Sequence, residues 1–409
     1  MQTDLPGKDL LMTLPAEDRR NFASITVSIS LKNFFDSIPN VVLMPYLYDI
    51  GASFTLLGLF RAIPSAVGLF SSRLWGVLSD YFSRRKPFIV LSFLLSIPFS
   101  LAYAFKADSP ADFLVIRAVH SLFSLGAGIV PATIASASTQ LGKAFGDYAF
   151  ATSLAGTSGG MLGGWFVERH GIRAAFLLSI FGSLSSSTIF LLTYREEGQE
   201  ARSVSPKRVL LKTISFDLAP KAWHLTFLAV LTALRSSFFG LPAVMKMYVL
   251  LGRSMAGYTT ILSLAGLTSI LTSPLYGRAV DKLGAKESAK LSLLAYSIYL
   301  PLMALINNPV MFAILWAIPI GNLEYTALMS LKVMVSNPSG MAADISTMEG
   351  LASLSLAVGN VMAGAVVDLL GKTSSILMAT VFDIMALLLL LGLDFKESGQ
   401  SKLGRSGNA

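Results

Sequence analysis

One spacing occurs four times in this chain: a glycine, an acidic residue four positions later, and a small residue three positions beyond that. The four copies are Gly76/Asp80/Ser83, Gly164/Glu168/Gly171, Gly277/Asp281/Gly284 and Gly364/Asp368/Gly371. Their leading glycines are separated by 88, 113 and 87 residues, so two near-equal steps flank a longer one. This arrangement indicates four repeats grouped as two halves, with additional chain between the halves. In an apolar chain, such internal symmetry is typical of membrane transporters.

The composition places the chain in a lipid bilayer. Of its 409 residues, 53% are hydrophobic and 14% are charged, whereas about 25% of residues are charged in soluble domains. Apolar runs long enough to cross a bilayer are predicted at 22–48, 53–79, 87–106, 112–137, 147–168 and 173–194. A second set is predicted at 223–250, 255–278, 288–306, 309–334, 346–368 and 373–393. We therefore expect an all-α polytopic membrane protein with twelve transmembrane helices.

The two sets of spans divide the chain into two six-helix bundles joined by a charged linker. The predicted parts are an N-terminal tail (1–20), a first bundle (21–194), a linker (195–222), a second bundle (223–394) and a C-terminal tail (395–409). The linker accounts for the longer middle step between the repeats. We expect the bundles to be related by a pseudo-two-fold axis along the membrane normal.

The basic residues fall mainly on one side of this topology. With both termini inside, the inner side receives Lys8, Arg19, Arg20, Arg84, Arg85, Lys86, Lys143, the linker bases, Arg278, Lys282, Lys286, Lys396, Lys402 and Arg405. The outer side receives Lys106, Arg169, Arg173, Arg253 and Lys372. This asymmetry follows the positive-inside rule and predicts a multi-pass protein of the cell membrane with both termini cytoplasmic. It also accounts for the net charge of +8, so no nucleic-acid partner is expected.

Several other classes of function lack the residues that they need. The chain has no cysteine, which excludes thiol catalysis and iron–sulfur ligation. Its three histidines at 120, 170 and 224 are too scattered to predict a metal site, and no cofactor is expected. The sequence Gly156-Thr-Ser-Gly-Gly160 matches a nucleophile-elbow pattern but lies in an apolar, glycine-rich stripe rather than on a strand-to-helix turn. We therefore expect no enzyme activity and assign no catalytic residue.

Two of the four repeats carry a further resemblance. The segment 76–85 (GVLSDYFSRR) resembles the motif between helices 2 and 3 of the major facilitator superfamily, and 277–286 (GRAVDKLGAK) resembles it as well. In the first copy Tyr81 stands where the family has a base, and Ser83 stands where it has a glycine. The resemblance implies the fold of that superfamily and alternating access around a midplane site. The residues to which it assigns a gating role are Gly76, Asp80, Arg84, Arg85, Gly277, Asp281, Lys282 and Gly284.

The physical roles of the motif residues can be separated. The glycine allows close helix approach, and the aspartate can accept hydrogen bonds from helix N-termini and arginines of the other half. We expect the two copies on the cytoplasmic side to lock that side in the outward-open state. The two other copies, at Glu168 and Asp368, lack dense basic partners, so we expect them to matter less.

The predicted fifth span carries a set of small residues that resembles the antiporter motif of the family: Ala155, Gly159, Gly160, Gly163 and Gly164. Gly160 stands where that motif has proline, which puts an antiporter function in doubt. The alternative is simple helix packing through small residues, and this is the interpretation that we favour.

Ionisable residues within the predicted spans mark a candidate binding site, because burying them in lipid costs roughly 2.5–3.5 kcal/mol each. Most lie on helices 1, 4, 7 and 10, which line the central cavity in proteins that this chain resembles. The predicted substrate-binding residues are Lys32, Asp36, Arg117, Arg235 and Glu324. The candidates for proton coupling are Asp36, His120 and Glu324, because burial can bring a carboxyl group into the working pH range.

Aligning Pro39 of helix 1 with Pro242 of helix 7 superimposes Lys32 on Arg235. Two bases facing each other across a cleft repel when the cleft is empty and are relieved by an anion. The alternative for Lys32 is neutralisation by Asp36, one helical turn away.

The basic excess of these helices favours a small organic anion or anionic metabolite as substrate, with protons as a candidate coupling ion. Drug or cation efflux by proton antiport is the alternative, favoured if Asp36 and Glu324 face an aromatic cavity unpaired. A non-transporting membrane sensor with the same fold is a third alternative. The expected partners are the small-molecule substrate and the lipid bilayer, and we expect a monomer.

Overall fold

The computed structural model describes residues 16–82, 84–123, 129–131, 133–134, 141–196, 220–336 and 341–393. All regular structure in these ranges is helical, as predicted. Most of the predicted linker and of both predicted tails lies outside the described residues. The burial of Gly76 and the side chain of Asp80 are not described either, so the first gating motif is described only in part.

Five longer helices are described in the N-terminal half. They are α1 (Ala16–Asp49), α2 (Phe54–Phe82), α3 (Lys86–Phe105), α4 (Pro110–Leu122) and α6 (Leu141–Thr193). The C-terminal half contains six: α8 (Pro220–Leu250), α9 (Met255–Leu283), α10 (Ala285–Leu305), α11 (Pro309–Trp316), α12 (Ile320–Val335) and α13 (Met341–Leu391). Seven described stretches are long and apolar enough to cross a membrane.

The two longest helices each cover two predicted spans. α6 bends at Gly171 and α13 bends at Gly371, where φ is +78° and +85°. These values lie in the left-handed region, which glycine enters without the steric cost that a Cβ imposes. Each bend reverses the chain with one non-helical residue. Counting the arms separately, the described helices are consistent with the twelve predicted spans.

The predicted span 309–334 is divided into two shorter helices. α11 ends at Trp316 and α12 begins at Ile320, with Pro319 as the residue before α12. Neighbouring α9 pairs the polar groups at this break: Thr268 Oγ1 donates to the carbonyl of Ala317 (2.9 Å), and Asn322 Nδ2 donates to the carbonyl of Ser269 (2.9 Å). The break is therefore held by hydrogen bonds with α9. One of these bonds gives the Ala317 carbonyl a partner, because a buried carbonyl must be hydrogen-bonded.

Equivalent helices pair in the two halves. The closest associations are α1 with α6 in the N-terminal half and α8 with α13 in the C-terminal half. α1 lies directly against the glycine-rich stretch of α6, where a Cβ at Gly159 would collide with the carbonyl of Phe34 and one at Gly163 would meet that of Ile38. The glycines in the first arm of α6 thus serve close packing, and the tightest approaches to α1 are those of Gly159 and Gly163.

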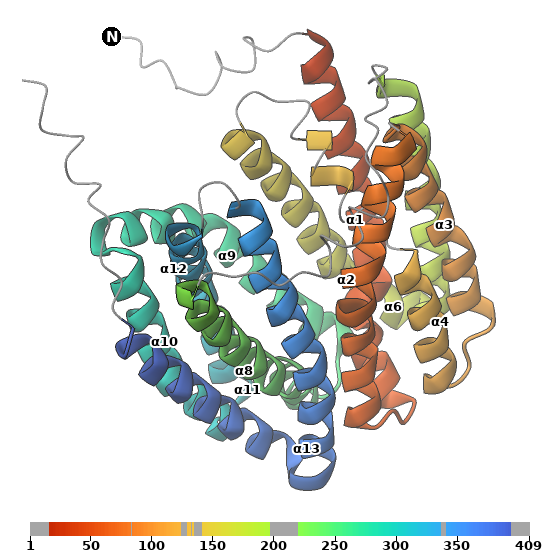
Figure 1. Cartoon of the computed structure of the whole chain (residues 1–409). Coiled ribbons are helices and arrows are strands. Elements are labelled where there is room, and N and C mark those ends of the chain that lie inside the picture. Colours follow the sequence, from red (N-terminus) through yellow and green to blue (C-terminus); the bar gives the residue numbers. More distant parts are fainter. Residues whose placement is uncertain are drawn as a thin grey trace, which may run out of the picture.

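The two halves meet along two helix pairs, α2 with α13 and α6 with α9. Figure 1 shows α13 (blue) running beside α2 (orange) at this junction. Hydrogen bonds between the halves gather at the end where α2 and α9 begin and where α6 and α13 bend. We call this the joined end and define it by residues 49–55, 168–173, 250–256 and 364–372. The opposite end holds the start of α1 and the end of α13.

Candidate functional site

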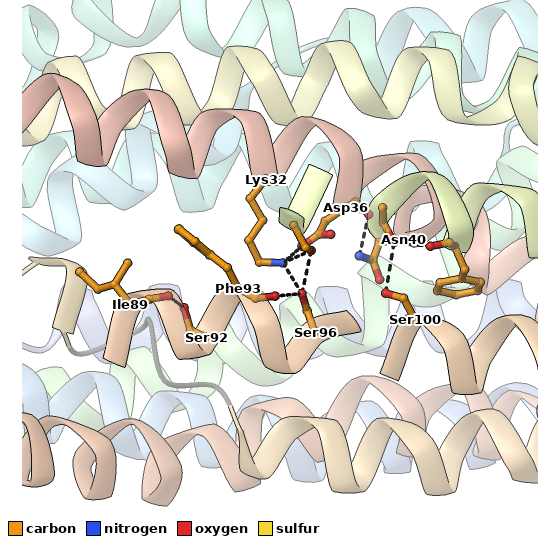
Figure 2. A network of polar contacts seen from close by, with 11 residues as sticks. Lys32, Asp36, Asn40, Ile89, Ser92, Phe93, Ser96 and Ser100 are labelled. Carbon is orange, nitrogen blue, oxygen red and sulfur yellow. Dashed lines mark hydrogen bonds and ion pairs between the residues drawn. The ribbon is translucent and has the colours of Figure 1, made fainter. Parts of the chain in front are cut away.

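A polar cluster around Lys32 lies inside the N-terminal half. Lys32 Nζ forms an ion pair with Asp36 Oδ2 at 2.6 Å, one turn along α1. It also donates to Ser96 Oγ on α3 (3.1 Å) and Ser183 Oγ on α6 (3.4 Å), and the two serine oxygens are 2.8 Å apart. Figure 2 shows the lysine reaching from α1 to Ser96. The Lys32 side chain is 16% exposed and that of Asp36 31%, so this pair is neutral and accessible to water.

A cavity of about 420 Å³ extends from this cluster between α1, α2, α3, α4 and α6. Arg117 and His120 line it from α4, three residues apart and therefore on one helix face. His120 stacks on Phe99 with ring centroids 4.6 Å apart, and the Arg117 guanidinium lies 5.2 Å from the centroid of the Phe60 ring. Within the described part of the chain, no carboxylate pairs with Arg117.

The C-terminal half contains a second cluster, centred on Arg235 of α8. Its Nη2 forms hydrogen bonds with both carboxylate oxygens of Glu324 on α12, at 2.8 and 2.6 Å, and its Nη1 with Asp383 Oδ1 on α13 at 3.0 Å. Ser297 Oγ on α10 donates to Asp383 Oδ2 (2.9 Å). The guanidinium also lies 3.9 Å from the centroid of the Tyr296 ring. The Arg235 side chain is 5% exposed and that of Asp383 is fully buried.

A cavity of about 320 Å³ borders this second cluster and is lined from α8, α10, α12 and α13. Lys332 on α12 and Glu349 on α13 face it as an additional ion pair, with Nζ and Oε1 2.5 Å apart. Lys332 is buried, whereas 45% of the Glu349 side chain is exposed. Counting Arg235, Glu324 and Asp383 with this pair gives one more carboxylate than base.

The two clusters use equivalent positions of the two halves. Lys32 and Arg235 are the two bases that the proline alignment pairs. Ser96 on α3 corresponds to Ser297 on α10, 201 residues later, and Ser183 on α6 corresponds to Asp383 on α13, 200 residues later. Each cluster therefore joins the first, third and sixth span of its half. The offsets of 201 and 200 residues between equivalent repeats could have found the Ser96/Ser297 and Ser183/Asp383 pairs in the sequence.

The structure divides the predicted site residues between the two cavities. Lys32, Asp36, Arg117 and His120 line the first cavity, and Arg235 and Glu324 line the second. The alternative for Lys32, neutralisation by Asp36, is what the ion pair shows. The Arg235 guanidinium already faces two carboxylates, so its role in substrate binding stays a prediction. Sequence reasoning missed Lys332 and Glu349, and it did not place Asp383 among the predicted binding residues.

The described gating residues lie at the opposite end. Asp281 and Lys282 are exposed near the end of α9, and Asp281 has no hydrogen-bond or ion-pair partner within the described residues. Gly284, with φ +84°, forms the turn between α9 and α10. In the first copy, the amide of Arg85 donates to Glu196 and that of Arg84 to the carbonyl of Ser79 (3.3 Å). The gating role of Gly76, Asp80, Gly277 and these residues stays a prediction.

The family model of the Major Facilitator Superfamily matches residues 25–255, more than half of the chain. The chain belongs to this superfamily. It is an all-α, multi-pass membrane protein of a transporter family, which confirms the resemblance that the repeated motif carried.

Curated relatives and solved structures extend this comparison. The chain is 24% identical over 279 residues to the multidrug resistance protein MdtG of Escherichia fergusonii, covering 65% of this chain and 64% of the relative. It is equally similar to MdtG of Salmonella typhi, covering 65% of each chain. The match thus spans slightly less than two thirds of these relatives.

Its fold is similar to that of a mutant of the nucleoside transporter NupG (TM-score 0.75, 12% identity, 90% of this chain and 98% of that one). The human organic anion transporter MFSD10 is also similar (TM-score 0.66, 16% identity, 92% and 100%). At these identities the likeness concerns the fold alone.

Proposed function

We propose that this chain is a secondary active transporter that carries a small organic anion by alternating access, with Arg117 binding the anion. The observation that carries the proposal is a guanidinium on the wall of the 420 Å³ cavity with which no described carboxylate pairs. An arginine is always charged and presents a planar set of donors that matches a carboxylate or phosphate. A cavity of this size suits a small molecule.

The charges around the two cavities support this choice of residue. Lys32 is paired with Asp36, and Arg235 is paired with Glu324 and Asp383. Among the three predicted binding bases, Arg117 is therefore the one that has no described carboxylate partner and can bind a ligand. Arg61 of α2 is a second base for which the described residues offer no carboxylate; its Nη1 lies against Gly240 of α8, at the junction of the halves.

The Lys32–Asp36 pair offers a physical route for proton coupling. Protonation of Asp36 would break the pair and leave Lys32 as a second cation on the cavity that Arg117 lines. A proton and an anion would then favour each other's binding, since coupling between two ligands is reciprocal. Asp36 suits this role better than Glu324, because its side chain is accessible from the cavity while that of Glu324 is buried against Arg235.

The arrangement of the halves supports alternating access. They are joined at one end by the helix pairs α2–α13 and α6–α9, while each half carries its own cavity. We further propose that the joined end faces outward and the opposite end faces the cytoplasm, since the positive-inside rule assigns the basic loops to that side. The bundle boundaries 21–194 and 223–394 and a monomeric state belong to the same proposal.

Cation efflux is the second candidate, because the Arg235 cluster and the Lys332–Glu349 pair together have one more carboxylate than base. The relatives named as multidrug resistance proteins are compatible with it. Glu324 and Asp36 are both paired, however, so neither meets the condition under which the sequence favoured a cation.

The test is a thermal-shift screen of the purified protein with organic anions, nucleosides and lipophilic cations. A ligand at 100 times its Kd stabilises the folded state by about 2.7 kcal/mol. We expect anions to raise the melting temperature of the wild type and of the control Arg173→Ala, whose side chain is exposed and pairs with Asp108. Arg117→Ala should lose the shift. Stabilisation by cations alone, unchanged in Arg117→Ala, would refute the anion proposal.

A further inference from the structure

The repeat copy at Asp368 caps a helix of the other half. The carboxylate lies just before the bend of α13 and accepts hydrogen bonds from the backbone amides of Phe54 and Thr55, both at 2.8 Å. It also accepts one from Thr55 Oγ1 at 2.6 Å. Phe54 and Thr55 open α2, whose first amides have no partner within the helix. A carboxylate from the C-terminal half therefore satisfies the N-terminus of a helix in the N-terminal half.

The copy at Glu168 makes the equivalent contact in the reverse direction. It lies before the bend of α6, and its Oε1 accepts from the amide of Ala256 (2.9 Å) and from Ser254 Oγ (3.0 Å) at the start of α9. Here the N-terminal half caps a helix of the C-terminal half. The acids are 200 residues apart, so the two contacts obey the internal symmetry of the chain.

Each capped helix also has a local serine cap, so the acid adds a second one. Ser53 Oγ accepts from the amide of Leu56 at 3.2 Å, and Ser254 Oγ accepts from the amide of Gly257 at 3.0 Å. The local serine holds the end of its own helix, whereas the acid from the other half holds the two halves together. Charge-assisted bonds to a helix N-terminus are favourable because the helix dipole places partial positive charge there.

Both contacts lie at the joined end, and the corresponding contact at the opposite end is absent from the described residues. At the opposite end, Asp281 is the repeat acid whose side chain is described. It is exposed and makes no hydrogen bond or ion pair with the described residues. Among the repeat copies whose side chains are described, the acid-to-helix contacts between the halves therefore lie at the joined end.

We propose that Glu168 and Asp368 are gate residues: their two caps hold the joined end closed, and both must break before that end can open. This inference rests on the alternating access proposed above. It replaces the expectation that these two copies matter less, which was based on missing basic partners. Their partners are backbone amides and hydroxyl groups, so dense basic residues are not required. The strength of the two caps then sets how much of the protein is open at each end.

The chain contains no cysteine, so single cysteines can report this opening without background. Thr259 on α9 is fully buried, and its Oγ1 would collide with a Cβ at Gly164 of α6. In a Thr259→Cys background we expect slow labelling by maleimide in detergent. Asp368→Asn and Glu168→Gln should each speed labelling by roughly tenfold, the factor that corresponds to losing one charged hydrogen bond, and the double variant should speed it further.

The matched control is Asp108→Asn. Asp108 is also an exposed acid, but its partner Arg173 belongs to the same half (2.8 Å), so its labelling rate should equal that of the parent. Thr55→Val removes one bond to Asp368 and keeps the carboxylate; it should give a smaller increase and serves if Asp368→Asn folds poorly. Equal labelling in the double variant and the parent would overturn the proposal, as would the same increase in Asp108→Asn. The readout needs no ligand, so it stands even if Arg117 binds no anion.

Discussion

The Lys32 and Arg235 clusters occupy equivalent positions but balance their charge differently. Lys32 is neutralised from its own helix by Asp36, and its contacts with α3 and α6 are serine hydroxyls. Arg235 is neutralised from two other helices, by Glu324 and Asp383. One cluster is therefore an accessible pair with weak ties between helices, and the other is a buried ionic joint of α8, α10, α12 and α13. The N-terminal half therefore carries a charge pair that can respond to water or ligand, which we call the responsive cluster. The C-terminal half carries a buried ion-pair network that holds its helices, which we call the rigid cluster.

The largest effect that separates the two clusters should come from removing their bases. Arg235→Ala leaves two buried carboxylates close together without a cation, and breaking a buried pair in this way costs about 3–5 kcal/mol. Lys32→Ala leaves one carboxylate that water can reach, so a loss of about 1 kcal/mol is expected. Apparent melting temperatures of the two purified variants measure the difference. Equal losses would contradict the distinction between a rigid and a responsive cluster.

An intermediate effect should follow when the sixth-span residues are exchanged. Asp383→Ser gives the second cluster the residue of the first. It removes the charged hydrogen bond from Arg235, at about 1.5–3 kcal/mol, together with the bond from Ser297. Ser183→Asp buries a second carboxylate beside Lys32, which Asp36 already neutralises, and should destabilise by a similar amount.

The double variant Ser183→Asp with Asp36→Asn moves the partner of Lys32 to the sixth span and should recover part of that loss. Non-additivity of the two changes in thermal unfolding is the measurement, since residues in one network couple. Strict additivity would show that Ser183 does not belong to the Lys32 cluster.

The smallest effect is expected at the Lys332–Glu349 pair on the rim of the second cavity. Glu349→Gln keeps an acceptor for Lys332 and changes a side chain that is partly in solvent, so the loss should stay below about 1 kcal/mol. The effect should shrink further in high salt, because exposed charges are screened. A loss as large as that of Asp383→Ser would place this pair within the buried ionic joint.

The sequence predicted the helices well because a helix that crosses a bilayer needs a long apolar segment, and hydropathy detects such segments directly. Within a few residues, α3, α8 and α10 occupy the predicted spans 87–106, 223–250 and 288–306. The break before Ile320 was missed, because no local signal shows that α9 will satisfy the carbonyl of Ala317.

Several charged residues within the spans were also found from sequence, since each is costly in lipid, although Lys332 and Glu349 were missed. Their partners were harder to predict, because pairing depends on helix positions that only the fold defines. Glu324 and Asp383 lie 89 and 148 residues from Arg235, and neither separation is encoded in a motif. The repeat offset is the exception: a step of 201 residues relates Ser96 to Ser297, and a step of 200 residues relates Ser183 to Asp383.

The bend at Gly371 fixes the rotational phase of the arm that follows it. Each residue of an α-helix turns the chain by about 100° and advances it by about 1.5 Å. Gly371 is the one non-helical residue between the arms. If it is deleted, no loop residue remains that could compensate for the change in rotation. The second arm would rotate as a unit and carry Asp383, twelve residues on, to another face of the helix, away from Arg235. The register of the ionic joint in the C-terminal half is thus set by a glycine more than three helical turns away.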